Sequence, residues 1–148
     1  MKSMANKADR EELIARLKRI EPDTRPAWGR MSAPQMIVHL IDQMHHTLGD
    51  ATAKPIISPM RLPGIRYLAI YVIPWPKGRA QGPPEAFVTK PTEWSADLSE
   101  LLGLVDRFVA KDVNGPWPLH AIFGKLSGKD WGVFCYKHFD HHIRQFRQ

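Results

Sequence analysis

The sequence has a single cysteine, Cys135, and lacks long apolar segments. One cysteine excludes a disulfide within the chain and is typical of a reducing compartment. The first residues lack the apolar core of a signal peptide, so we expect a cytoplasmic protein. The longest apolar run, Tyr67–Ile73, is far shorter than the roughly 20 residues that a membrane span requires, and we expect no membrane partner.

The chain also lacks the motifs of the common nucleotide-binding and hydrolase classes. It has no Gly-rich phosphate loop, no Walker pattern and no nucleophile elbow. The net charge is +6, but the 21 Lys and Arg residues are dispersed, without a basic stripe interleaved with aromatic side chains. We therefore interpret the charge as a solvated basic surface and expect no specific nucleic-acid partner.

Four segments carry the apolar periodicity of amphipathic helices. They are Lys7–Ile20, Ser32 to near Gly49, about Trp94 to Val113, and Ser127 to the end of the chain. The second and fourth segments each begin with a serine that can cap the helix, with Gln35 or Asp130 three residues later. The length of 148 residues predicts one domain, residues 1–148.

About forty residues, Asp50–Pro91, separate the second and third predicted helices. The segment contains the apolar stretch Ile65–Ile73. A loop of this length without any structure is uncommon in a compact domain, so we expect the segment to contain a short helix. A long crossover would let the second and third helices run parallel. The predicted fold is therefore all-α, a four-helix bundle with one long crossover between helices two and three.

His138 and His142 lie one helical turn apart in the last segment, together with large apolar side chains. On a helical wheel both histidines fall in the same inward sector as Trp131, Phe134 and Phe146. Positions i and i+4 allow two imidazoles to converge on one metal ion. The alternative is a pair of core histidines that bond to backbone, carboxylates or water, and the pair alone does not decide between the two.

His39, in the middle of the second predicted helix, is the best candidate for a third ligand, with Asp42 three residues later. Three imidazoles suit divalent Zn, Ni, Fe or Mn and leave a coordination position open. Periodicity alone places His39 outside, because the most apolar sector of this helix is centred elsewhere. Since the helix is apolar over much of its circumference, its inward direction is poorly determined.

The segment Ser32-Ala-Pro-Gln-Met-Ile-Val-His39-Leu-Ile-Asp42, together with the terminal His138-Phe-Asp-His-His142, resembles the DinB-like superfamily. These are metal-binding four-helix proteins related to bacillithiol transferases, and the resemblance extends over nearly the whole chain. Their pattern of one histidine on the second helix and HxxxH on the last matches His39, His138 and His142. Residues 120–132 and 136–146 resemble an uncharacterised subfamily with a domain of unknown function, although its usual His-Pro is His120-Ala here.

The resemblance implies a metal-dependent enzyme that hydrolyses a small molecule or transfers a low-molecular-weight thiol to one. Asp42 is the candidate catalytic base, with a solvated carboxylate as the alternative. A non-catalytic metal-binding or stress-response bundle, with a structural or vestigial site, is the competing hypothesis. The chain could also form a homodimer.

Four further side chains could contribute to such a site, and the sequence leaves their roles open. Cys135 could add a thiolate or be a small buried hydrophobe, and His141 could donate a hydrogen bond near the ligands. Gln145 falls in the inward sector, and His120 lies in the subfamily segment. The Pro74-Trp-Pro76 stretch could be a lid or a rigid connector.

Overall fold

The computed structural model describes residues 1–77 and 88–148, and they are mostly helical. This confirms the helical class predicted from the periodicity. Four longer helices are joined by short elements in the crossover and by a small hairpin. The four longer helices are α1, α2, α4 and α5. The elements in chain order are α1 (Lys7–Leu17), α2 (Ala33–Leu48), the 3-10 turn η1 (Pro59–Arg61), α3 (Pro63–Tyr67), the π-helical turn η2 (Leu68–Val72), α4 (Trp94–Ala110), β1 (Leu119–His120), β2 (Gly124–Lys125) and α5 (Gly128–Gln145).

Both predicted serine caps are present. The Ser32 hydroxyl accepts from the backbone N–H of Gln35, and the Gln35 side chain accepts from the backbone N–H of Ser32. The hydroxyl of Ser127 and the carboxylate of Asp130 form the same reciprocal pair at the start of α5. Each box satisfies amide groups that have no partner inside the helix, so local sequence sets where α2 and α5 begin.

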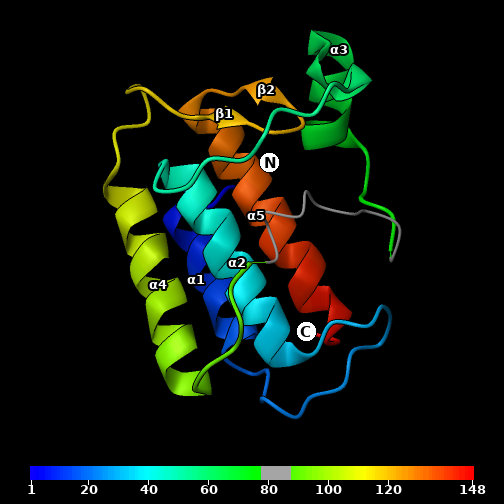
Figure 1. Ribbon diagram of the computed structural model, residues 1–148, viewed down its shortest axis with the longest axis vertical. Coiled ribbons are helices and arrows are strands. Elements are labelled where there is room, and N and C mark those ends of the chain that lie inside the picture. The colour runs from blue at the N-terminus through cyan, green and yellow to red at the C-terminus, as the bar shows by residue number, and fades with distance from the viewer. Residues whose placement is uncertain (78–87) are drawn as a thin grey trace.

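The helices α2 and α4 run in the same direction, opposite to α1 and α5 (Figure 1). Contacts between α2 with the residues just after it and α4 advance together along the chain, since His45 Nε2 lies 3.6 Å from Glu100 and Asp50 forms an ion pair with Arg107. The predicted parallel arrangement is therefore present. The connection between α2 and α4 contains η1, α3 and η2, as expected for a crossover with a short helix, and its residues 78–87 lie outside the described part.

One core joins the four longer helices. Its buried side chains extend from Met4 before α1 to Phe146 after α5. Helix α2 lies in this core over most of its length, since eleven of its sixteen residues are buried. A helix buried on two sides must be apolar over most of its circumference, which is the composition of Met36–Met44.

The structure differs from the prediction in two places. The antiparallel hairpin of β1 and β2, in which Leu119 pairs with Lys125, adds a small sheet to the predicted all-α fold. Its strands are two residues long, too short for any alternation of apolar residues to predict. Helices α1 and α4 also end three residues earlier than expected, because i to i+3 hydrogen bonds such as Ile20 N–H to Leu17 O close the last turn of α1.

Candidate metal centre

Helix α5 presents His138 and His142 toward α2, as the wheel predicts. Phe134 and Trp131, one and two turns before His138, are 3% and 1% exposed, which identifies this sector as the core side of the helix. His138 is 8% exposed, whereas His142 is half-buried. The pair therefore extends from the core toward the surface, with His142 nearer to solvent.

His39 lies on α2 and is only 4% exposed. The periodicity of α2 alone placed this side chain outside, and that prediction was wrong. The reason is that α2 packs against both α4 and α5, so its less apolar sector is also covered. The interpretation of His39 as the third candidate ligand agrees with its position.

The three imidazoles converge through their Nε2 atoms. His138 Nε2 lies 3.1 Å from His39 Nε2 and 3.1 Å from His142 Nε2. Potential ligand atoms of the three residues all lie within 4.8 Å of one another. Metal–nitrogen bonds of about 2.1 Å would separate two such nitrogens by about 3.0 Å at right angles and about 3.4 Å in a tetrahedron. The two 3.1 Å distances lie within this range.

Hydrogen bonding explains this cluster less well. A single hydrogen on His138 Nε2 can lie along only one of the two 3.1 Å axes. Its other ring nitrogen, Nδ1, is buried without a hydrogen-bond partner among the described residues, and this observation favours neither explanation, because an ion on Nε2 would not give Nδ1 a partner. A cation between the rings would be shared by all three Nε2 lone pairs, so the donor set fits a metal ion.

The tautomer of His142 follows from its neighbour. Gln145 Nε2 donates to the backbone carbonyl of Trp28 at 2.8 Å, which turns Gln145 Oε1 toward His142 Nδ1 at 3.3 Å. An amide oxygen only accepts, so Nδ1 carries the hydrogen and Nε2 keeps its lone pair for the cluster. A histidine that donates its second N–H to a fixed oxygen is the usual arrangement of a metal ligand.

Gly29 makes this contact possible. Its backbone is left-handed, with φ +79°, and a Cβ atom on it would lie 2.6 Å from Gln145 Nε2. A side chain at this position would displace the amide from Trp28 O. The loop before α2 therefore supports a ligand on α5 through a glycine and a backbone carbonyl.

Burial keeps the rings in the neutral form that a metal requires. Loss of solvent and the neighbouring histidines hold the pKa of His138 well below its usual value, and burial lowers the pKa of His142 to about 3. Both rings are therefore uncharged at neutral pH. A neutral imidazole, with a lone pair on one nitrogen, is the form that binds metal.

Comparison with protein-family models, curated proteins and solved structures gives no match.

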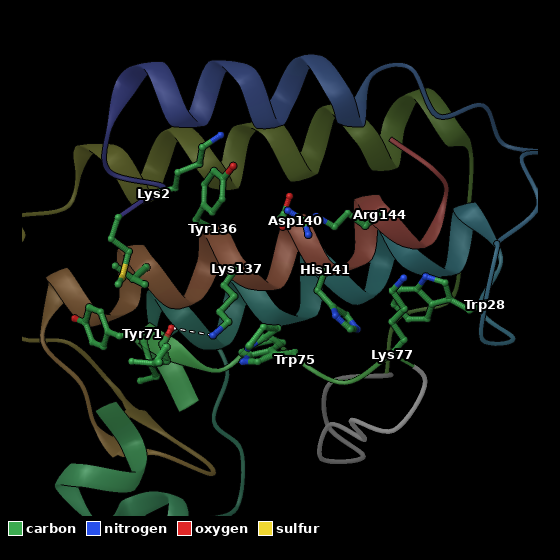
Figure 2. A pocket seen from close by; sticks show the side chains of 15 residues that line it. Lys2, Trp28, Tyr71, Trp75, Lys77, Tyr136, Lys137, Asp140, His141 and Arg144 are labelled. Carbon is green, nitrogen blue, oxygen red and sulfur yellow. Dashed lines mark hydrogen bonds and ion pairs between the residues drawn. The ribbon is translucent and has the colours of Figure 1, made fainter. Parts of the chain in front are cut away.

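A groove of about 360 Å³ lies along α5, and its lining includes Trp28, Trp75 and His141 but none of the three clustered histidines. In Figure 2 the side chain of His141 lies between those of Trp28 and Trp75. The ring centroids are 4.8 Å apart for Trp28 and His141 and 6.0 Å apart for Trp75 and His141. Trp75 also contacts His138, with centroids 5.6 Å apart. Trp75 and His141 thus form the boundary between the groove and the cluster.

Lys137 fixes the chain that carries Trp75. Its ammonium group donates to the carbonyls of Ala69 at 2.9 Å, Ile70 at 3.2 Å and Ile73 at 2.6 Å, at the carboxyl end of η2. Partial burial lowers the pKa of this amine. The Trp75 indole N–H donates to Ala69 O as well, at 3.1 Å. The Pro74-Trp-Pro76 stretch is therefore tied to α5, as a rigid connector would be.

Asp42 follows His39 by three residues and is buried, but its carboxylate bonds to the chain before α4 and not to a clustered histidine. One oxygen accepts from the backbone N–H groups of Val88 and Thr89 at 2.9 and 3.0 Å, and the other accepts from the Thr89 hydroxyl at 2.5 Å. It is 7% exposed, so it is not a solvated carboxylate. These bonds position the chain that enters α4, and a role as a base stays a prediction.

The other two candidates lie outside the histidine group. Cys135 is fully buried, with its sulfur 3.6 Å from the Thr47 hydroxyl, and burial raises its pKa to about 12. It has the environment of a small buried hydrophobe. His120 is buried among Phe123, Trp131 and Phe134, and its Nδ1 accepts the backbone N–H groups of residues 122 and 123.

Sequence reasoning missed the parts of the site that come from loops and from long-range contacts. Trp28 and Gly29 carry no local signal, because their roles depend on Gln145, more than a hundred residues away. Lys137 resembles any basic residue on a helix until the crossover carbonyls are in place. Spacing along the chain indicates only the ligands that one helix can bring together.

Proposed function

We propose that the protein is a metal-dependent enzyme in which His39, His138 and His142 hold a divalent ion that acts on a small molecule. The observation that carries this proposal is the approach of His138 Nε2 to both other Nε2 atoms at 3.1 Å. Three protein ligands leave room for a substrate or water, as in catalytic sites. The ion would be Zn, Ni, Fe or Mn, all of which accept imidazole nitrogens.

Such an ion polarises a substrate or lowers the pKa of a water or thiol beside it. Either hydrolysis or transfer of a low-molecular-weight thiol to an electrophile would use this property. The chain's own contribution is orientation, since Gln145 fixes the tautomer of His142. Burial keeps His138 neutral.

The groove beside the cluster would admit the substrate. Its volume of about 360 Å³ is in the range of pockets for small molecules. Trp28, Trp75 and His141 give it aromatic walls next to the ligands. His142 is half-buried, and its ring centroid lies 5.3 Å from that of His141, which lines the groove.

The resemblance to the DinB-like superfamily supports the same function. It assigns the same three histidines, and we propose that the four longer helices with their crossover have that superfamily's four-helix topology. A homodimer would also be consistent with it. The proposal does not depend on this resemblance, because the distances between the ring nitrogens stand by themselves.

The competing proposal is a non-catalytic metal-binding or stress-response bundle. The burial of His39 and His138, at 4% and 8% exposure, favours it, because structural metals are enclosed. A filled coordination sphere would support this alternative. An ion that exchanges a water or thiol ligand would support the enzyme.

Elemental analysis of protein purified without a metal-chelating tag tests the site. We expect about one ion per chain, and loss of the ion in His39→Ala, His138→Ala and His142→Ala. His45→Ala, which changes another histidine of α2, is the matched control and should keep the ion. Absence of an ion even after addition of Zn, Ni, Fe or Mn would contradict the proposal.

If the ion is present, the loaded protein should be screened for thiol transfer and for hydrolysis, with His142→Ala as the inactive control. Activity that survives loss of the ion would contradict a metal-dependent enzyme. Stable binding of the ion without activity, together with an ion that exchanges no ligand, would favour the non-catalytic bundle.

A further inference from the structure

The crossover exposes an unusual amount of apolar surface. Leu62, Ile65, Leu68 and Val72 are 57%, 38%, 44% and 57% exposed. Their spacing of three, three and four residues brings each side chain close to the next on one side of α3 and η2. We call them the crossover stripe. Nearby Ile57 is fully exposed. Contiguous apolar surface of this kind marks an interaction site.

The stripe is at one end of the molecule. Figure 1 shows α3 standing out beyond the longer helices, at the end where α5 begins and beside β1 and β2. A projecting element is well placed to meet a flat surface. None of the three clustered histidines belongs to it, so this inference does not depend on the proposed metal site, although Val72 also lines the groove beside Trp75.

The crossover is held in this position by specific bonds. Arg61 donates to the carbonyls of Ile56 and Ala121 at 3.0 and 2.9 Å, and Arg66 donates to the carbonyl of Lys125 at 2.9 Å. These guanidinium groups meet carbonyl oxygens rather than carboxylates, so within residues 1–77 and 88–148 no ion pair neutralises their charge.

The charge around the stripe has one predominant sign. From Ala51 to Lys77 the chain has four basic residues and no acidic residue; the four are Lys54, Arg61, Arg66 and Lys77. Lys125 on β2 adds a fifth basic residue to this surface, and its backbone carbonyl is the one to which Arg66 donates. An acidic side chain, Asp130, also lies near this surface, where it accepts a hydrogen bond from the Tyr71 hydroxyl and interacts electrostatically with Arg66.

We propose that the crossover stripe docks on the surface of an anionic lipid bilayer. Apolar side chains on a short amphipathic element enter the headgroup region, while the surrounding Lys and Arg bind anionic headgroups. Tyr67 and Tyr71, stacked with centroids 5.0 Å apart, suit the polar boundary of a bilayer. This revises our expectation from the sequence that the protein has no membrane partner.

A second copy of the chain fits this surface less well. A two-fold contact through the stripe would bring the same basic residues of both copies together, and like charges in an interface are unfavourable. A bilayer with anionic headgroups has the complementary charge. This is the observation that decides between the two occupants.

Vesicle flotation tests the proposal with the full chain. The probes are vesicles of phosphatidylcholine alone and vesicles with about 30% phosphatidylglycerol, at low and at raised salt. We expect binding to the anionic vesicles that decreases as salt rises. The double variant Ile65→Ser/Leu68→Ser should bind at least about tenfold more weakly, and Lys54→Gln/Lys125→Gln should lose about fivefold for each charge.

Matched variants away from the stripe make the result specific. Val109→Ser changes an exposed apolar residue of α4, and Lys18→Gln/Arg19→Gln changes two exposed basic residues after α1. Both should bind almost as the parent does, and circular dichroism should show that all variants keep their helices.

Three results would overturn the proposal. One is absence of binding to anionic vesicles at low salt. Another is equal loss in the stripe variants and in their controls, which would indicate non-specific attraction of a basic protein. The third is a dimer in solution that Ile65→Ser/Leu68→Ser converts to a monomer, since the stripe would then be an interface between copies.

Discussion

The Oε1 atom of Gln145 lies 3.3 Å from Nδ1 of His142, and the same amide group donates to Trp28 O at 2.8 Å. This relationship joins the loop before α2 to a candidate ligand on α5. It fixes which nitrogen of His142 carries the hydrogen. The metal affinity of the cluster should therefore depend on a residue that touches no ion.

Replacement of Gln145 by Leu should weaken metal binding by about 10- to 100-fold, because His142 loses the acceptor that fixes its tautomer. Gln145→Glu keeps an acceptor oxygen and should recover part of the affinity. Competition with a chromophoric chelator measures both. Gln148→Ala is the control, since its backbone carbonyl, not its side chain, accepts from Arg16. Unchanged affinity in Gln145→Leu would exclude the proposed support.

Gly29→Ala should destabilise the protein more than Gly49→Ala does. Both glycines have a left-handed backbone, but a Cβ at Gly49 meets nothing within 4 Å, whereas a Cβ at Gly29 would lie 2.6 Å from Gln145 Nε2. The conformational cost of about 1–2 kcal/mol is common to both. The close contact adds about 1–3 kcal/mol at Gly29. Urea unfolding after chelation measures the difference, and equal losses would contradict the steric argument.

Lys137→Met should loosen the crossover. The substitution keeps much of the alkyl chain and removes the donor to the carbonyls of Ala69, Ile70 and Ile73. We expect a loss of about 1–3 kcal/mol in the free energy of unfolding and faster amide exchange in residues 68–77. Hydrogen-exchange mass spectrometry measures the second effect. Lys129→Met, at an exposed position of α5, should change neither.

His120 should make the protein less stable as the pH falls. Burial lowers its pKa from 6.5 to about 3 in the folded protein. From pH 6.5 down to about 3 the unfolded chain binds a proton that the folded one does not, so the free energy of unfolding decreases by up to about 1.4 kcal/mol per pH unit.

His120→Asn tests this dependence, because an amide oxygen can accept the N–H groups of residues 122 and 123 without titrating. Urea unfolding of chelated protein between pH 6 and 4 should show a slope shallower by about 1 kcal/mol per pH unit. The absolute stability should also fall, because the smaller side chain packs less well. The same slope in both proteins would contradict a buried, neutral His120.

For residues 1–77 and 88–148, no helix is long and apolar enough to cross a membrane. That finding agrees with the short apolar run Tyr67–Ile73. The structure adds what the sequence did not indicate, namely that much of this run and its neighbours face outward. A hydrophobic run predicts burial only when another element covers it.

The sequence by itself determined the starts of α2 and α5 and the pairing of His138 with His142. A capping serine acts on amides two or three residues away, and a helical turn brings i and i+4 together without help from the rest of the chain. These local signals were sufficient to predict the helical class and two of the three clustered histidines with their inward direction.

Only the tertiary structure decided the direction of His39, the partner of Gln145 and the exposure of the crossover stripe. His39 faces inward because α5 covers a sector of α2 that its own pattern leaves undetermined. Trp28 meets Gln145 across 117 positions of the chain. Such contacts depend on how elements pack, and packing is a property of the assembled core rather than of any short segment.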